Sequence, residues 1–120
     1  MKFKPHNRYM VGPWNHGSAP AWSATILMAG DIGISRHILR ATCFPSGLCV
    51  SIEQTQFIYA GGVEDGFIIR LIQYPPFVEL ESSLRTKAIK IGKRLAELNS
   101  QWSFTIMFPL KNEYFSRREK

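Results

Sequence analysis

The chain has 120 residues, of which 45% are hydrophobic and 12% aromatic, a composition that excludes an intrinsically disordered protein and fits one domain. Fifteen Lys and Arg residues against nine Asp and Glu residues give a formal charge of +6, which favours an anionic partner. No run approaches the ~18 continuous apolar residues of a membrane span, and polar residues interrupt the N-terminal segment where a signal peptide needs its apolar run, so we expect a cytoplasmic protein without a membrane partner.

The first third of the chain predicts an arm, a strand and a helix. Residues 1–21 contain three prolines and two glycines and show no hydrophobic period, which predicts an N-terminal arm or extended loop that drapes over the domain through Tyr9 and Trp14. The run WSATILMAG, residues 22–30, is short and apolar and predicts a strand. Asp31 is a suitable N-cap for a helix that extends to Pro45 and Gly47.

The middle of the chain predicts a hairpin. Residues 48–59 alternate in polarity, but the alternation changes phase before Phe57, which predicts a bulge near Gln54–Gln56. The glycine-rich run AGGVEDG, residues 60–66, predicts the turn, and FIIRLIQY, residues 67–74, predicts the returning strand.

The last third predicts a helix and a strand. Residues 78–99 carry leucines and isoleucines at spacings of three and four, residues 103–108 alternate as in a strand, and residues 111–120 form a charged C-terminal tail. The order strand, helix, strand, strand, helix, strand predicts a ferredoxin-like βαββαβ fold. We therefore expect one α+β domain over residues 22–110, with a four-stranded antiparallel sheet and two helices on one face.

The hairpin is apolar on both faces. Phe67, Ile69 and Leu71 would face the helices, which leaves Ile68, Ile72 and Tyr74 on the open face of the sheet beside Phe57 and Tyr59. An apolar face of this size is unusual in a monomer. Three explanations remain open: the arm covers the face, two copies of the chain associate through it, or it is a platform for a ligand. The run EDGFIIRLI keeps only two residues of the RNA-recognition signature, which excludes a standard domain of that class.

Several side chains are candidates for binding an anionic ligand. Arg70 is the lone charge in an apolar strand, so it either pairs with Glu53 or presents its guanidinium to an anion. Basic residues also recur on one face of each helix, where they are either solvated or in contact with phosphate. The predicted phosphate-binding residues are Arg70, Lys87, Lys90, Arg94, Arg36 and Arg40, and the residues predicted to stack on a base are Tyr59, Phe57 and Trp22.

Catalytic and metal-binding patterns are not evident in the sequence. It contains neither an H-E-x-x-H metal motif nor a G-x-S-x-G nucleophile elbow. Cys43 and Cys49 lack zinc-ligand spacing and are expected to be free thiols. We therefore predict no cofactor, no metal site and no catalytic residues.

The length, the basic charge and the hairpin IYAGGVEDG resemble small uncharacterised bacteriophage-encoded proteins, over roughly residues 48–108. This resemblance implies a protein that neutralises a host component or sequesters a host nucleotide signal. It also implies symmetric oligomers with basic pockets between subunits, in the host cytoplasm.

Together these patterns predict a non-catalytic binding protein of phage type. It would bind or sequester an anionic ligand, a nucleotide signal or a short nucleic acid, as a homo-oligomer. One alternative is a protein-interaction inhibitor that docks its apolar sheet face on a host protein. The other is a small enzyme that processes a nucleotide.

Overall fold

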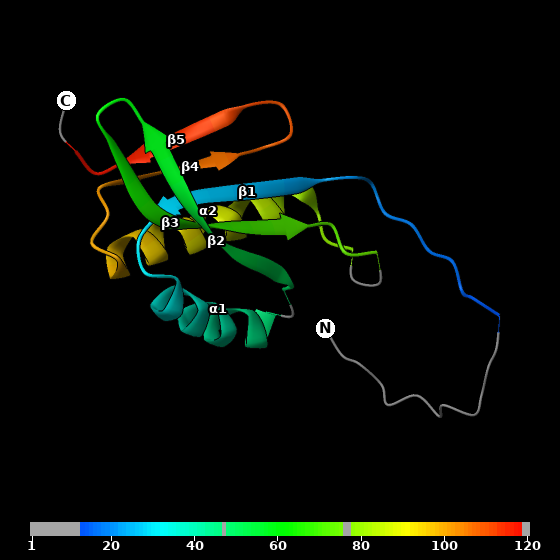
Figure 1. The fold of residues 1–120 in the computed structure, drawn as a ribbon. Coiled ribbons are helices and arrows are strands. Elements are labelled where there is room, and N and C mark those ends of the chain that lie inside the picture. Colours follow the sequence, from blue (N-terminus) through cyan, green and yellow to red (C-terminus); the bar gives the residue numbers. More distant parts are fainter. Residues whose placement is uncertain (1–12, 47, 76–77, 119–120) are drawn as a thin grey trace.

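The computed structural model describes residues 13–46, 48–75 and 78–118. These form two helices and five strands, and Figure 1 shows both helices on the same face of the sheet. In chain order they are β1 (Ser23–Ala29), α1 (Ile32–Ser46), β2 (Val50–Tyr59), β3 (Gly62–Ile72), α2 (Glu81–Leu98), β4 (Ser103–Met107) and β5 (Asn112–Ser116). The predicted α+β class and the order of the first six elements are confirmed.

The sheet has five antiparallel strands in the order β2-β3-β1-β4-β5, so the prediction of four strands is wrong. The first four strands are compatible with a ferredoxin-like arrangement. The fifth strand, β5, lies in the segment predicted as a charged tail. It pairs with β4 because Phe115 stacks on Phe104 with ring centroids 5.0 Å apart, and because Glu113 binds Arg85 of α2. Charged neighbours conceal this short strand in the sequence.

The β2–β3 hairpin is longer and more regular than predicted. Its register runs without interruption from the pair Val50 and Leu71 to the pair Tyr59 and Gly62, so the predicted bulge near Gln54–Gln56 is wrong. The turn consists of Ala60 and Gly61 alone, and the φ angle of +93° at Gly61 is one that glycine adopts readily. Residues 62–66, predicted as part of the turn, therefore belong to β3.

The core lies between the sheet and the helices, as the hairpin pattern predicted. Phe67, Ile69 and Leu71 are fully buried, and they pack in one cluster with Leu84 and Leu95 of α2. The other face of the hairpin is more open, and Ile72 is 48% exposed there.

A polar cluster ties the start of α1 to the end of α2. The Asp31 carboxylate accepts a hydrogen bond from the Ile34 amide at 3.0 Å, which confirms the predicted N-cap. The Asn99 side chain accepts from the Asp31 amide at 2.8 Å and donates to the buried Ser35 hydroxyl at 2.9 Å. These bonds hold the two helices side by side at one end and thereby shape the groove between them.

Residues 13–22 contain neither helix nor strand, and Figure 1 shows them running away from the sheet. Trp14 is 99% exposed, so the prediction that it packs the arm onto the domain is wrong. Tyr9 lies outside the described residues. Within the described part of the chain, neither helix is long and apolar enough to cross a membrane.

Candidate functional site

The predicted ligand residues separate into two regions of the molecule. Phe57, Tyr59 and Arg70 lie on the β2–β3 hairpin. Lys87, Lys90 and Arg94 of α2 line the groove between α1 and α2, and Arg36 and Arg40 of α1 line a neighbouring groove between α1 and β2. Trp22 joins neither region: it lies just before β1, with its ring centroid 6.2 Å from that of Phe108.

Arg70 is already paired. Its guanidinium donates to the carboxylate of Glu53 on the neighbouring strand, and both side chains are about half exposed. Of the two roles open to Arg70 from the sequence, the structure shows the cross-strand ion pair.

A carboxylate lies next to two aromatic rings on one face of the hairpin. Glu64 is directly opposite Phe57 in the strand register. The Tyr59 hydroxyl donates a hydrogen bond to the Glu64 carboxylate at 2.9 Å. We call Phe57, Glu64 and Tyr59 the hairpin row. The two aromatic residues were predicted from the sequence, but Glu64 was not, because the glycines of residues 60–66 predicted a turn there.

Gly66 makes room for the Phe57 ring. A Cβ atom at Gly66 would lie 2.5 Å from Cε2 of Phe57 and 2.3 Å from the backbone oxygen of Met28. Both distances are far below van der Waals contact, so a side chain at this position would displace the ring or the strand. The position of Phe57 in the hairpin row therefore depends on a glycine in the facing strand.

The hairpin is the acidic part of a basic protein. Residues 50–72 contain three carboxylates, Glu53, Glu64 and Asp65, against one cation, Arg70, a net charge of −2 in a chain of +6. The hydrogen bond to Glu64 raises the pKa of Tyr59 above its ordinary value, with a further contribution from the Glu64 charge. Aromatic faces beside a carboxylate attract organic cations, so the chemistry of the hairpin row suits a cationic ligand.

The end of the hairpin is open to solvent. Tyr59 is 53% exposed on the face of the hairpin row, and Ile58 and Val63 are 80% and 55% exposed on the opposite face. The hairpin row is thus a platform rather than an enclosed pocket, and a ligand bound on it would need a further surface to exclude water.

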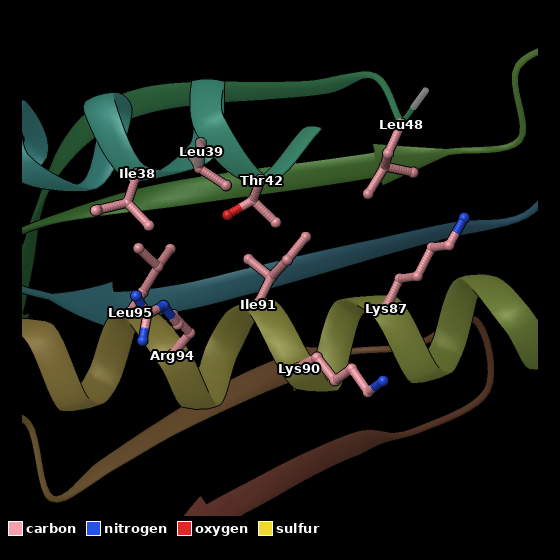
Figure 2. Close-up of a pocket in the computed structure, with 9 residues that line it drawn as sticks. All are labelled: Ile38, Leu39, Thr42, Leu48, Lys87, Lys90, Ile91, Arg94 and Leu95. Atoms are coloured by element: carbon pink, nitrogen blue, oxygen red, sulfur yellow. The ribbon is translucent and has the colours of Figure 1, made fainter. Parts of the chain in front are cut away.

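The second region is a groove between the two helices. Figure 2 shows Ile91 and Leu95 pointing from α2 toward Ile38 and Leu39 of α1, with Lys87 extending toward the end at which Leu48 lies. The cavity has a volume of about 190 Å³. We call it the α1–α2 groove, lined by Ile38, Leu39, Thr42, Leu48, Lys87, Lys90, Ile91, Arg94 and Leu95. The structure therefore brings three of the predicted cations to one apolar cavity.

A second cavity, of about 420 Å³, lies where the end of α2 meets β4 and β5. Trp102, Phe104, Tyr114 and Phe115 line it, and the Arg117 guanidinium lies 5.6 Å from the centre of the Trp102 ring. Sequence analysis missed this aromatic cluster because half of it lies in the segment predicted as a tail.

Neither Cys43 nor Cys49 forms a disulfide in the part of the chain that the structure describes. Burial raises the pKa of the Cys43 thiol, and the neighbouring Cys49 raises it further. A raised pKa keeps a thiol protonated and weakens it as a nucleophile. Among the described residues, no three His, Cys, Asp or Glu side chains gather as a metal site would require.

No protein-family model and no curated protein sequence matches the chain. Among solved structures the fold is similar to that of a phage SAM lyase in its apo state. That likeness has a TM-score of 0.64 and 16% sequence identity, and covers 92% of this chain and 98% of the lyase. A phage SAM lyase in complex with S-methyl-5′-thioadenosine is also similar, with a TM-score of 0.58, 12% identity, and coverage of 88% and 96%.

These neighbours overturn the predicted function. A non-catalytic protein that sequesters an anionic ligand is wrong, because both similar structures are of an enzyme, one of them with a nucleoside bound. The alternative of a small nucleotide-processing enzyme fits better. The resemblance to phage proteins is supported in its coarse form, since the similar structures are of phage proteins.

Proposed function

We propose that this protein is an enzyme of phage type, on a ferredoxin-like fold with a fifth strand, that splits S-adenosylmethionine (SAM) and releases S-methyl-5′-thioadenosine. The observation that carries the proposal is the fold. It matches phage SAM lyase over nearly the whole of both chains, and one of the matched structures contains S-methyl-5′-thioadenosine.

The hairpin row supplies the side chains that such a substrate needs. SAM carries a sulfonium cation next to a nucleoside, and its net charge is positive at neutral pH. A carboxylate beside aromatic faces attracts such a cation, and the same faces can stack on adenine. We therefore assign Phe57, Glu64 and Tyr59 to substrate binding. The cationic α1–α2 groove is unsuited to a sulfonium, because Lys90 and Arg94 would repel it.

The reaction requires little covalent chemistry from the protein. When the bond between the sulfonium sulfur and the γ-carbon of the methionyl group breaks, its electron pair moves to sulfur. S-methyl-5′-thioadenosine then leaves as a neutral thioether. The γ-carbon of the four-carbon fragment then either bonds an oxygen of the fragment's own carboxylate, which gives a lactone, or forms a double bond as the neighbouring carbon loses a proton. Since water is not consumed, the enzyme acts by holding the substrate in a reactive shape and keeping solvent away.

Solvent exclusion is the reason to include a second copy of the chain in the proposal. The hairpin row is open, with Tyr59 53% exposed, and Ile58 and Val63 are exposed on the opposite face of the same hairpin end. An exposed apolar surface next to a ligand platform is typical of a protein interface. We propose that the chain self-associates through this end of the hairpin, so that the hairpin row becomes enclosed.

The test is direct. The full-length protein is incubated with SAM, and the products are separated by chromatography and identified by mass. S-methyl-5′-thioadenosine should accumulate together with one four-carbon product, and S-adenosylhomocysteine, which lacks the sulfonium charge, should remain intact. Glu64→Gln should lower the rate, whereas Lys93→Ala, an exposed site on α2, should leave it within about twofold of the parent.

The proposal fails if the folded protein leaves SAM intact at every concentration tested, including concentrations at which native mass spectrometry shows an oligomer. Self-association is tested separately by that measurement. An active monomer would exclude the second copy and support the lyase activity. An inactive oligomer would support self-association and exclude the lyase activity.

A further inference from the structure

The α1–α2 groove combines an apolar floor with a cationic edge, and the proposed lyase reaction uses neither. We propose that this groove is a second binding site, for a small organic monoanion: an apolar body with a single carboxylate, sulfonate or phosphate group.

The floor of the groove consists of side chains that also belong to the core. Leu39, Leu48, Ile91 and Leu95 are each less than 10% exposed, and they are held in place by the sheet beneath them. The hydrogen bonds of Asn99 to Asp31 and Ser35 fix one end of the two helices. The cavity of about 190 Å³ is therefore a preformed feature of the packed domain, which lowers the entropic cost of filling it.

Two of the three cations at the edge of the groove are not paired with a carboxylate among the described residues. Lys87 is bound to Glu79, with 2.8 Å between its Nζ and each carboxylate oxygen. Lys90 and Arg94 form no ion pair among the residues that the structure describes. Figure 2 places Lys90 between Lys87 and Arg94 along α2, with its side chain extending outward. Two unpaired cations beside an apolar cavity suit one acid group of a bound molecule.

The surroundings strengthen this charge preference. A neighbouring shallow groove shares Leu39 and Leu48 with the α1–α2 groove and adds Arg36 and Arg40. No carboxylate lines either groove among the described residues. The local field therefore favours an anion and opposes the sulfonium substrate assigned to the hairpin row.

The dimensions favour a small ligand over a polyanion. From Lys87 to Arg94 the helix advances only about 10 Å, which limits the number of phosphates that the edge can contact. The floor is apolar, and a nucleic acid backbone would leave it unused. A compact molecule with one charged end satisfies both the floor and the edge.

The site is separate from the hairpin row. Phe57, Glu64 and Tyr59 lie on β2 and β3 with their side chains on the sheet face opposite the buried Phe67, Ile69 and Leu71. The groove lies on the helical face. A molecule in the groove and a nucleoside on the hairpin should therefore bind independently of each other.

The experiment uses 8-anilinonaphthalene-1-sulfonate, a fluorescent molecule with an apolar body and one sulfonate, titrated against the full-length folded protein. Saturable binding with a blue-shifted emission is expected. The double variant Lys90→Ala, Arg94→Ala should weaken the affinity about three- to tenfold, as for the loss of two partly exposed charge contacts. The single variant Lys93→Ala on the same helix should change the affinity by less than twofold, and 1-anilinonaphthalene, which lacks the sulfonate, should bind several-fold more weakly.

Amide NMR shifts then locate the probe. Shifts confined to residues around Leu39, Ile91 and Leu95, unchanged when S-methyl-5′-thioadenosine is added, would support the site. The proposal is overturned by shifts centred on the hairpin row, by displacement of the probe with S-methyl-5′-thioadenosine, by an equal loss of affinity in Lys93→Ala, or by the absence of saturable binding. Thermal melts of each variant establish that it is folded before it is titrated.

Discussion

The β2–β3 hairpin and the α1–α2 groove have opposite chemistry. The hairpin holds three of the nine carboxylates of the chain and exposes the aromatic side chain of Tyr59. The groove has no carboxylate among the described residues that line it and buries most of its aliphatic side chains. A bulk charge of +6 is therefore misleading as a guide to the substrate, because the region best suited to a sulfonium is the acidic part of the molecule.

The two regions also differ in completeness. A single chain forms the whole α1–α2 groove, since core residues form its floor and hydrogen bonds hold its two helices together. The hairpin row is unfinished, since Tyr59 within it is 53% exposed. This difference explains why we propose a second copy of the chain for one region and a small ligand for the other.

The largest expected effect comes from Gly66→Ala, which would disrupt the hairpin but leave the α1–α2 groove intact. The new Cβ would lie 2.3 Å from the Met28 oxygen and 2.5 Å from Phe57. We expect a loss of about 1–3 kcal/mol in the free energy of unfolding, measured by denaturant titration, together with loss of SAM cleavage. Gly17→Ala is the control, because nothing lies within 4 Å of its Cβ position. Equal stability of the two variants would contradict the close approach at Gly66.

The next largest effect should come from Glu64→Gln, which removes one charge from the hairpin row and keeps its shape. Loss of a charge-assisted contact to the sulfonium should lower kcat/KM for SAM about 10- to 100-fold. Arg94→Ala, in the groove, should leave kcat/KM within about twofold of the parent. If the two variants lower kcat/KM equally, the assignment of SAM binding to the hairpin row and not to the α1–α2 groove is wrong.

A smaller effect is expected from Tyr59→Phe. The Tyr59 hydroxyl orients Glu64 by its hydrogen bond of 2.9 Å, so its loss should reduce kcat/KM a few-fold and leave the fold intact. Ultraviolet titration of the parent should show one tyrosine with a pKa above the ordinary value of about 10, and this feature should vanish in Tyr59→Phe. In Glu64→Gln the pKa of Tyr59 should return toward its ordinary value. Because folding raises the pKa of Tyr59, its hydrogen bond to Glu64 stabilises the folded protein below the ordinary pKa. This stabilisation is lost as the pH rises through the pKa of Tyr59 in the folded protein.

The smallest effect should be a pH-dependent one at the β5 edge. Hydrogen bonds from Arg85 hold the pKa of Glu113 below its ordinary value. Desolvation opposes this shift, and the charges of Arg85 and Lys111 add to it. The stability that this pair provides is present above the ordinary pKa of about 4.3 and is lost as pH falls through the folded value. Melting temperatures of the parent and Glu113→Gln should differ slightly at neutral pH and converge in acid. A difference that persists below pH ~3 would exclude this mechanism.

Local patterns predicted much of the fold. The alternation in residues 67–72 correctly separated buried Phe67, Ile69 and Leu71 from exposed Ile72, because a strand alternates its side chains whatever packs against it. Asp31 was correctly predicted as an N-cap for a similarly local reason. The strand β5 was missed because it depends on distant partners, with Phe115 stacking on Phe104 and Glu113 binding Arg85.

The candidate sites were predicted in part. Phe57 and Tyr59 are conspicuous in the sequence, but Glu64 is recognised only when the hairpin register places it opposite Phe57. Lys87, Lys90 and Arg94 are evident from their helical spacing, but the apolar floor beside them requires α1 and α2 to meet.

By itself, then, the sequence determined the α+β class, the faces of the hairpin and the basic stripe of α2, because these follow from side-chain periodicity over neighbouring residues. Only the tertiary structure decided the fifth strand, the pairing of Glu64 with Phe57 and Tyr59, and the groove between the helices. Those features join residues that are apart in the chain. Their energy comes from packing and hydrogen bonds that exist only once the strands and helices have assembled.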